Sequence, residues 1–182
     1  KDHLTILNSL AKLYELSDNF ALASSTLDKA VNVARSKYSD TDPDYGVTLD
    51  QIAGLQIKLG QYEKADQNIT RALTILEEFR KEDNRIAQYI HVIETQAKLY
   101  GIKGMFDEAQ ANLDRSRKLI SKADVAIGNE MSTAEELSSL LIQLGKYSQT
   151  EKLLTPLIKE YEGLFGPTSI RLIDPLVNRG RI

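Results

Sequence analysis

Leu59-Gly60-Gln61-Tyr62-Glu63-Lys64-Ala65 shows a pattern that recurs along this chain at intervals of about forty residues. Each copy contains a turn, then an aromatic residue, then a small residue. The other copies are Ser17-Asp18-Asn19-Phe20-Ala21-Leu22-Ala23, Lys103-Gly104-Met105-Phe106-Asp107-Glu108-Ala109 and Leu144-Gly145-Lys146-Tyr147-Ser148-Gln149-Thr150. A period of this length is typical of helical solenoids, whose units bury a core only against their neighbours. The sequence therefore predicts helix pairs stacked in tandem.

Apolar residues on both sides of the turn follow the helical period. Before the turn they are Leu49, Ile52, Ala53 and Leu55, and after it they are Ile69, Ala72, Leu73, Ile75 and Leu76. Two amphipathic helices, A and B, are therefore expected in each unit. Glycine can take the left-handed conformation that ends a helix, and Gly60, Gly104 and Gly145 occupy that place in three units. Asp18 replaces glycine in the first unit.

Small residues recur at matching places in these helices. Helix A has Ala11, Ala53, Ala97 and Ser138 at its eighth position. Helix B has Ala23, Ala65, Ala109 and Thr150 at the twentieth repeat position, then Ala30, Ala72, Ser116 and Leu157 at the twenty-seventh. These positions resemble the tetratricopeptide repeat over essentially the whole chain, although the fourth copy has larger residues in helix B. The resemblance implies an all-α fold, a right-handed alpha-alpha superhelix (solenoid) of tandem helix-turn-helix repeats.

The repeat is longer than usual. Equivalent positions are 42 residues apart from Ala11 to Ala53, 44 from Ala53 to Ala97, 41 from Ala97 to Ser138 and 39 from Ser138 to Val177. The ordinary repeat has about 34 residues, so the helices here are lengthened. In this respect the chain resembles kinesin light chains and many bacterial scaffold proteins. We expect four repeats, at residues 1–39, 40–81, 82–124 and 125–165, and the first helix of a fifth over residues 166–182.

Two prolines are expected to begin helices. Proline has a preset φ and no amide hydrogen, which suits the first position of a helix. Pro43 follows Asp42, a good N-cap residue, and Pro167 follows Gly166. We therefore expect one helix A to start at Pro43 and another at Pro167.

The composition excludes several classes of partner. The net charge is −3, with 23 basic and 26 acidic residues, so no electropositive face for nucleic acid is expected. No window has eighteen consecutive apolar residues, which argues against a membrane-spanning segment. There is no cysteine, so the redox environment is undetermined. The chain is expected to be a soluble fragment of a longer protein, and the cytoplasm is favoured although the compartment is not determined.

No residue pattern indicates catalysis. His3 and His91 are far apart, and neither is followed by His or Glu at the helical spacing of a zinc site. Gly145-Lys146 lacks the upstream glycine of a phosphate-binding loop. Helical solenoids normally present surfaces for binding. We therefore expect a chain that is not an enzyme and that has no cofactor or metal.

The surface expected to bind a partner is the concave side of the superhelix, which helix A lines. The fifth position of helix A holds Asn8, Asp50, Glu94, Glu135 and Asp174 in the successive units, an acid in four of five. In kinesin light chains this row is rich in asparagine and binds extended peptides, so the acids here favour a protein or peptide segment that carries Lys or Arg. The predicted partner-binding residues are Asp50, Ile57, Glu94, Lys98, Ile102, Glu135, Ile142 and Asp174.

The resemblance does not extend to tetratricopeptide domains that grip a terminal carboxylate. Those domains combine lysine, asparagine and arginine in the groove, and here Gln51, His91 and Thr95 occupy such places. Asp50 nearby would repel an anion. We therefore expect no carboxylate clamp.

Three alternatives stay open. The acids are also explained as hydrated surface that keeps a solenoid in solution. A scaffold that binds a partner segment is the main functional hypothesis, and the other is a structural or regulatory arm that packs on another domain of the same multidomain signalling or protease-like protein. The truncated ends would also allow self-association, through Leu172 and Leu176 for example.

Overall fold

The computed structural model describes residues 2–37, 39–80, 85–123, 130–169 and 172–181, without the side chains of residues 2, 121–123, 130–133, 136, 143, 164 and 174. The helices in these residues are α1 (Asp2–Leu16), α2 (Phe20–Lys37), α3 (Pro43–Lys58), α4 (Tyr62–Phe79), α5 (Ile86–Ile102), α6 (Phe106–Ala123), α7 (Glu130–Gln143), α8 (Tyr147–Phe165) and α9 (Ile173–Gly180). The odd-numbered helices are the expected A helices, and the even-numbered ones are the B helices.

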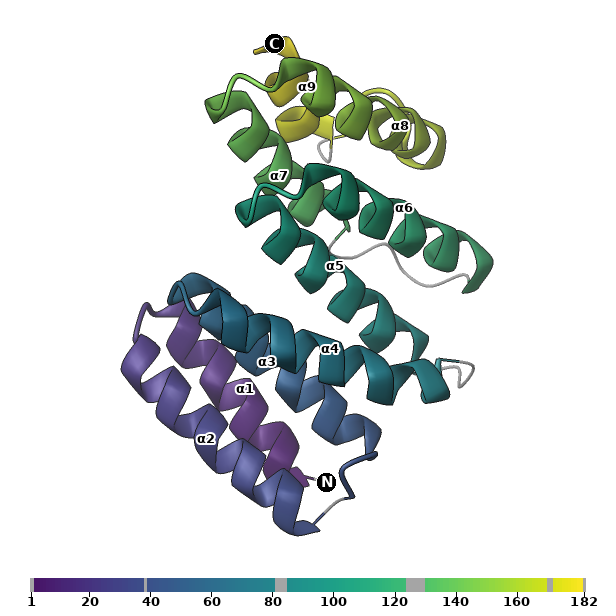
Figure 1. The fold of residues 1–182 in the computed structure, drawn as a ribbon. Coiled ribbons are helices and arrows are strands. Elements are labelled where there is room, and N and C mark those ends of the chain that lie inside the picture. The colour runs from purple at the N-terminus through teal and green to yellow at the C-terminus, as the bar shows by residue number, and fades with distance from the viewer. Residues whose placement is uncertain (1, 38, 81–84, 124–129, 170–171, 182) are drawn as a thin grey trace.

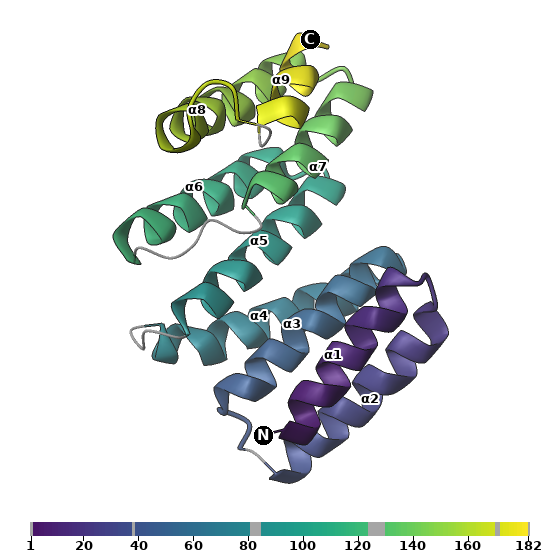
Figure 2. The same cartoon turned by 180° about the vertical axis from the view of Figure 1, so that it is seen from behind.

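The helices stack as a right-handed superhelix of tandem pairs. α1 packs on α2, α3 on α4, α5 on α6 and α7 on α8, and each B helix then packs on the A helix that follows it. Each A helix also contacts the next A helix, so that the A helices follow one another along one side of the stack. The two ends of the chain lie at opposite ends of this stack (Figures 1 and 2).

The four turns between A and B helices are alike. Gly60, Gly104 and Gly145 have φ of 71°, 78° and 69°, and Asp18 has φ of 57°. In each turn the residue after this one donates its amide to a carbonyl five residues back at 2.8 Å, as Gln61 does to Gln56. This is the hydrogen bond of a helix that ends in a left-handed residue. The prediction that these four residues end the A helices is confirmed.

The small residues of the repeat pattern are buried where helices A and B meet. Ala53, Ala65 and Ala72 have no exposed surface, and the same is true of their counterparts in the first repeat, Ala23 and Ala30. A short side chain at these places lets two helices approach closely.

The larger residues of the fourth repeat are also accommodated in the core. Thr150 and Leu157 are fully buried. The Thr150 hydroxyl donates to the carbonyl of Lys146 at 3.2 Å, so its polar group is satisfied within its own helix.

One of the two predicted helix starts is confirmed and the other is wrong. Asp42 caps α3 by accepting a hydrogen bond from the Asp44 amide at 2.8 Å, and Pro43 is the first helical residue. Pro167, in contrast, lies in a turn closed by a 3.2 Å bond from the Ser169 amide to the Gly166 carbonyl, and α9 begins only at Ile173. The preset φ of proline suits the second residue of a turn as well as a helix start.

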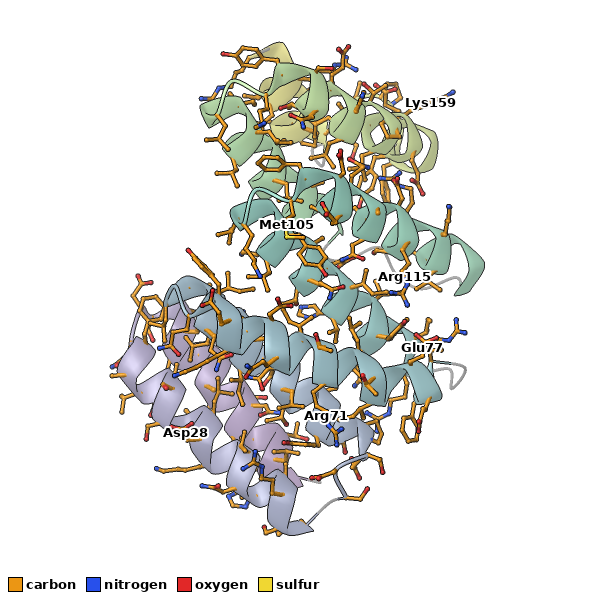
Figure 3. The ribbon with its side chains drawn as sticks, viewed as in Figure 1. Asp28, Arg71, Glu77, Met105, Arg115 and Lys159 are labelled. Carbon is orange, nitrogen blue, oxygen red and sulfur yellow. The ribbon has the colours of Figure 1, made fainter. Side chains whose placement is uncertain are left out.

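Neighbouring repeats are also joined by polar contacts between residues about one period apart. Arg85 donates to Asp44 at 2.7 Å, and Lys103 donates to Asp66 at 3.0 Å. Arg115 on α6 lies 3.3 Å from Glu77 on α4 and 5.2 Å from the centre of the Tyr89 ring (Figure 3). The Tyr89 ring is itself buried. These contacts link successive repeats, while most of the stability comes from the buried apolar core.

Candidate binding groove

A groove of about 230 Å³ lies on the side formed by α1, α3 and α5, and we call it the α1–α3–α5 groove. Its lining residues are Asn8, Ala11, Lys12, Glu15, Ala23, Leu27, Asp50, Gln51, Gly54, Leu55, His91 and Thr95. An adjoining hollow of about 300 Å³ between α3 and α5 shares Asp50, Gln51 and His91 with it. The groove therefore extends across three successive A helices.

A short hydrogen bond joins two of these helices inside the groove. The Nδ1 atom of His91 on α5 lies 2.5 Å from Oδ2 of Asp50 on α3. This bond raises the pKa of His91 above its ordinary value, and the charge of Asp50 adds to the effect. Asp50 is 4% exposed, whereas the His91 side chain is 49% exposed, so the acid forms the floor and the imidazole faces solvent.

A second polar contact joins α1 to α3. Asn8 Nδ2 donates to Thr48 Oγ1 at 3.2 Å, and the Thr48 hydroxyl donates in turn to the carbonyl of Asp44 at 2.9 Å. The same arrangement recurs near the other end of the stack, where Asn178 donates to Ser138 at 2.9 Å. Polar residues on adjacent A helices therefore pair repeatedly across the repeat boundary.

Glu15 is another acid that lines the groove. Its carboxylate accepts from Lys58 at 2.6 Å and from Lys12 at 3.3 Å. Burial raises the pKa of Glu15, but the hydrogen bond from Lys58 and the two positive charges outweigh it, so its pKa is lowered overall. Glu15 is thus an ionised partner for two lysines at neutral pH.

Glu94, the next predicted acid, lies outside this lining. It is 3% exposed, and its Oε1 accepts from the Ser116 hydroxyl on α6 at 2.7 Å. Burial raises the pKa of Glu94, and the bond from Ser116 and the nearby His91 only partly oppose that rise. Glu94 therefore connects helix A to helix B within its own repeat.

The predicted partner-binding residues fall into different environments. Asp50 lies in the groove, and Ile102 is 38% exposed at the end of α5. Ile57 is 4% exposed and belongs to the core, so it does not provide the exposed apolar contact that was expected of it. The half-buried residues among them are Lys98 on α5 and Glu135 and Ile142 on α7. Asp174 lies in α9, but its side chain is outside the described part of the chain.

Two alternatives from the sequence need correction. Asp50 and Glu94 are buried and hydrogen-bonded, so the explanation of the acids as hydrated surface is wrong for these two. Leu172 is 1% exposed because it packs against the core of the fourth repeat, so it does not offer a surface for self-association. The strongly exposed apolar residues of α9 are Ile173 and Val177.

Several groove residues were not predicted as binding residues. Glu15 and Leu27 line the groove, as do Gln51, His91 and Thr95, which the sequence had placed only where a carboxylate clamp would need other residues. The sequence did contain a signal for the contact between Asp50 and His91, since these residues are about one repeat apart and a carboxylate can accept a hydrogen bond from an imidazole. A repeat pattern does not show which member of such a pair is buried.

The His91–Asp50 bond predicts a pH dependence of stability. The pKa of His91 is raised on folding, so its contribution is complete below the unfolded value of about 6.5 and is lost as the pH rises through the folded value. The groups facing His91 are Asp50 on α3, Glu94 on α5 and Lys12 on α1.

Half-exposed ion pairs contribute about 0.2 to 1 kcal/mol, and we expect a loss in that range between about pH 6 and about pH 8.5. Urea unfolding at both pH values measures it. His91→Gln should remove the difference, and an equal pH dependence in this variant would contradict the assignment.

Comparison with known proteins identifies the repeat. The tetratricopeptide repeat family model matches residues 2–78. Residues 2–78 thus carry the tetratricopeptide repeat. The later helix pairs have the same left-handed turns, and the equivalent helix B positions are buried in them, although Thr150 and Leu157 are larger. No curated protein sequence matches it.

Solved structures share the fold of this chain. Two structures of a Podospora anserina protein, described as a kinesin light chain with nearly identical TPR-like repeats, superpose with a TM-score of 0.76 at 14% identity. Each match covers 98% of this chain and 84% of that one. BtubC (BKLC) from P. vanneervenii has a TM-score of 0.60 at 22% identity, with 91% of this chain and 64% of that chain covered. The stacked helix pairs here thus have the same fold as the TPR-like repeats of those structures.

Two further observations limit the chemistry of the described residues. None of their helices combines the length and the apolar character needed to cross a bilayer. In the same part of the chain, no three His, Asp or Glu side chains come together as a group that could hold a metal ion.

Proposed function

We propose that this tetratricopeptide repeat chain is a protein-interaction scaffold, and that it binds an extended segment of a partner protein in the groove formed by its A helices. The observation that supports this most directly is the α1–α3–α5 groove, an open hollow that crosses three successive repeats. A segment lying along it would make many modest contacts, whose sum must exceed the cost of ordering the segment.

The proposed site continues from this groove along α5 and α7. Ile102 offers an apolar contact at the end of α5, and the half-buried Ile142 lies near the end of α7. Lys98 and Glu135 lie on the same two helices, and Asp174 would extend the row to α9. We propose that the segment carries Lys or Arg, because Asp50 lies in the groove with one carboxylate oxygen that has no donor among the described residues.

A substitution that fills the groove tests this proposal. A Cβ atom added to Gly54 would have no other atom within 4 Å, so Gly54→Leu should start a side chain in open space and fill part of the groove. Gly163 on α8 is equally unobstructed and lies outside the groove, so Gly163→Leu is a matched control. Both changes replace a helical glycine, and both variants should fold at least as stably as the parent chain.

Peptides would be selected against the parent chain from a displayed random library and then measured for binding by fluorescence anisotropy. We expect the selected peptides to be enriched in Lys and Arg, and Gly54→Leu to weaken their binding by about tenfold or more. Gly163→Leu should leave it unchanged. Equal binding to all three proteins would show that the groove is not the site, and an absence of selected peptides would favour the alternative of an arm that packs on another domain.

A further inference from the structure

We propose that the α1–α3–α5 groove contains a subsite for one cationic side chain of the bound segment, held by Asp50 and Asn8. This inference rests on the proposed function, because it assigns a role to one part of the same groove. The evidence for this subsite is an excess of hydrogen-bond acceptors in the groove. Three buried oxygens of groove residues have no donor among the described residues: Asn8 Oδ1, Asp50 Oδ1 and Gln51 Oε1.

The orientation of the Asn8 amide follows from its neighbour. The Thr48 hydroxyl uses its only hydrogen to donate to the Asp44 carbonyl, so Thr48 Oγ1 can only accept from Asn8. Asn8 must therefore present its nitrogen to Thr48, which leaves Oδ1 as the atom without a partner. Asn8 is 8% exposed, so this oxygen belongs to a side chain that is almost completely buried.

Asp50 supplies the second acceptor, and it carries the negative charge. Oδ2 takes the Nδ1–H of His91, whereas Oδ1 has no donor. A buried acceptor without a donor is costly, and a carboxylate oxygen forms its strongest hydrogen bonds with cationic donors. The site therefore favours a group that brings several N–H bonds and a positive charge.

Three of the donors near the groove already face acceptors of the chain itself. Asn8 Nδ2 and His91 Nδ1 are used as described, and Lys12 is paired with Glu15. A carboxylate from a partner would thus meet the buried charge of Asp50 and the unpartnered oxygens beside it. The groove volume of about 230 Å³ is several times the roughly 30 Å³ that one water molecule occupies, which leaves room for a side chain. Ammonium has three donors and guanidinium has five, and both fit this chemistry.

The experiment uses defined probes and an isosteric variant. The ¹⁵N-labelled chain would be titrated with the N-acetyl amides of arginine, lysine, citrulline and aspartate and followed by NMR. Asp50→Asn keeps an oxygen for His91 and places an NH₂ group where the free acceptor was. Glu94→Gln removes the same charge from a buried acid outside the groove lining and is the matched control.

We expect saturable shifts in α1, α3 and α5 with the arginine or lysine probe, and none with aspartate or neutral citrulline. Asp50→Asn should weaken this binding by about tenfold, as expected for the loss of a charged hydrogen bond. Glu94→Gln should change it less than about twofold. Asn8→Leu removes the other oriented acceptor and should also weaken binding. This variant replaces Asp50→Asn in the experiment if Asp50→Asn fails to fold.

Three results would overturn the subsite: no saturable shift with either cationic probe, equal shifts with the aspartate probe, or equal weakening by Glu94→Gln. Either of the first two results would show that the unpartnered acceptors do not select a cation. The third would show that binding depends only on long-range charge. This failure differs from failure of the proposed function. Selected peptides that Gly54→Leu blocks and Asp50→Asn does not affect would keep the groove and reject the subsite. Binding of the cationic probe without any peptide binding would keep the subsite and reject the groove as a site for an extended segment.

Discussion

Ile93→Ala is expected to lower the free energy of unfolding by about 2 to 5 kcal/mol. Ile93 has no exposed surface, and it belongs to a core cluster with members from α1 to α6. Its helix α5 packs on helices of the repeats before and after it. Truncation removes apolar contacts and leaves a cavity that the surrounding helices fill only in part. Since each repeat is stabilised chiefly by its neighbours, the loss should affect both sides of α5.

Urea unfolding followed by circular dichroism measures this loss. Ile102→Ala is the matched control, because it makes the same change on the same helix at a side chain that is 38% exposed. The control should lose less than about 1 kcal/mol. If both variants lost equal stability, the burial pattern assigned to α5 would be incorrect. Ile102→Ala should nevertheless weaken peptide binding if Ile102 belongs to the proposed site.

Ala65→Leu is expected to lower the stability by about 1 to 3 kcal/mol through overpacking. Ala65 lies in the first turns of α4 and has no exposed surface where α4 packs on α3. A leucine there would force the two helices apart or its own side chain away from a preferred rotamer. The small residues at this place in the other repeats have the same role, so the result would apply to the repeat as a unit.

The control for Ala65→Leu is Ala111→Leu, which makes the same change at an exposed position of α6. Leucine and alanine both favour the helix, so this control should stay within about 0.5 kcal/mol of the parent chain. Thermal unfolding of the three proteins makes the comparison. A melting temperature of Ala65→Leu equal to that of the parent chain would contradict the register in which Ala65 faces α3.

The repeat register could be predicted from the sequence because it depends on local rules. A left-handed residue must follow each A helix, and a short side chain must lie where two helices cross. Gly60 and Asp18 met the first requirement, and Ala53 and Ala65 met the second. The start of the last helix was predicted wrongly because Pro167 fits a turn as well as a helix.

The candidate site was predicted only in part, since the row of acids does not reveal burial. Asp50 and Glu94 occupy the same repeat position, but Asp50 is joined to His91 of the next repeat and Glu94 to Ser116 of its own. Which partner each acid finds depends on how adjacent repeats rotate against one another. The period of the sequence pattern alone does not predict that rotation.

By itself, the sequence determined the all-α class, the length of the repeat, the turns and the small residues at the helix crossings, because these follow from backbone conformation and helical period over a few neighbouring residues. The tertiary structure alone decided that Ile57 is core, that Asp50 is buried beneath a half-exposed His91, and that Asn8 meets Thr48. Those features depend on contacts between residues about one repeat apart, whose geometry is set by the packing of whole helices.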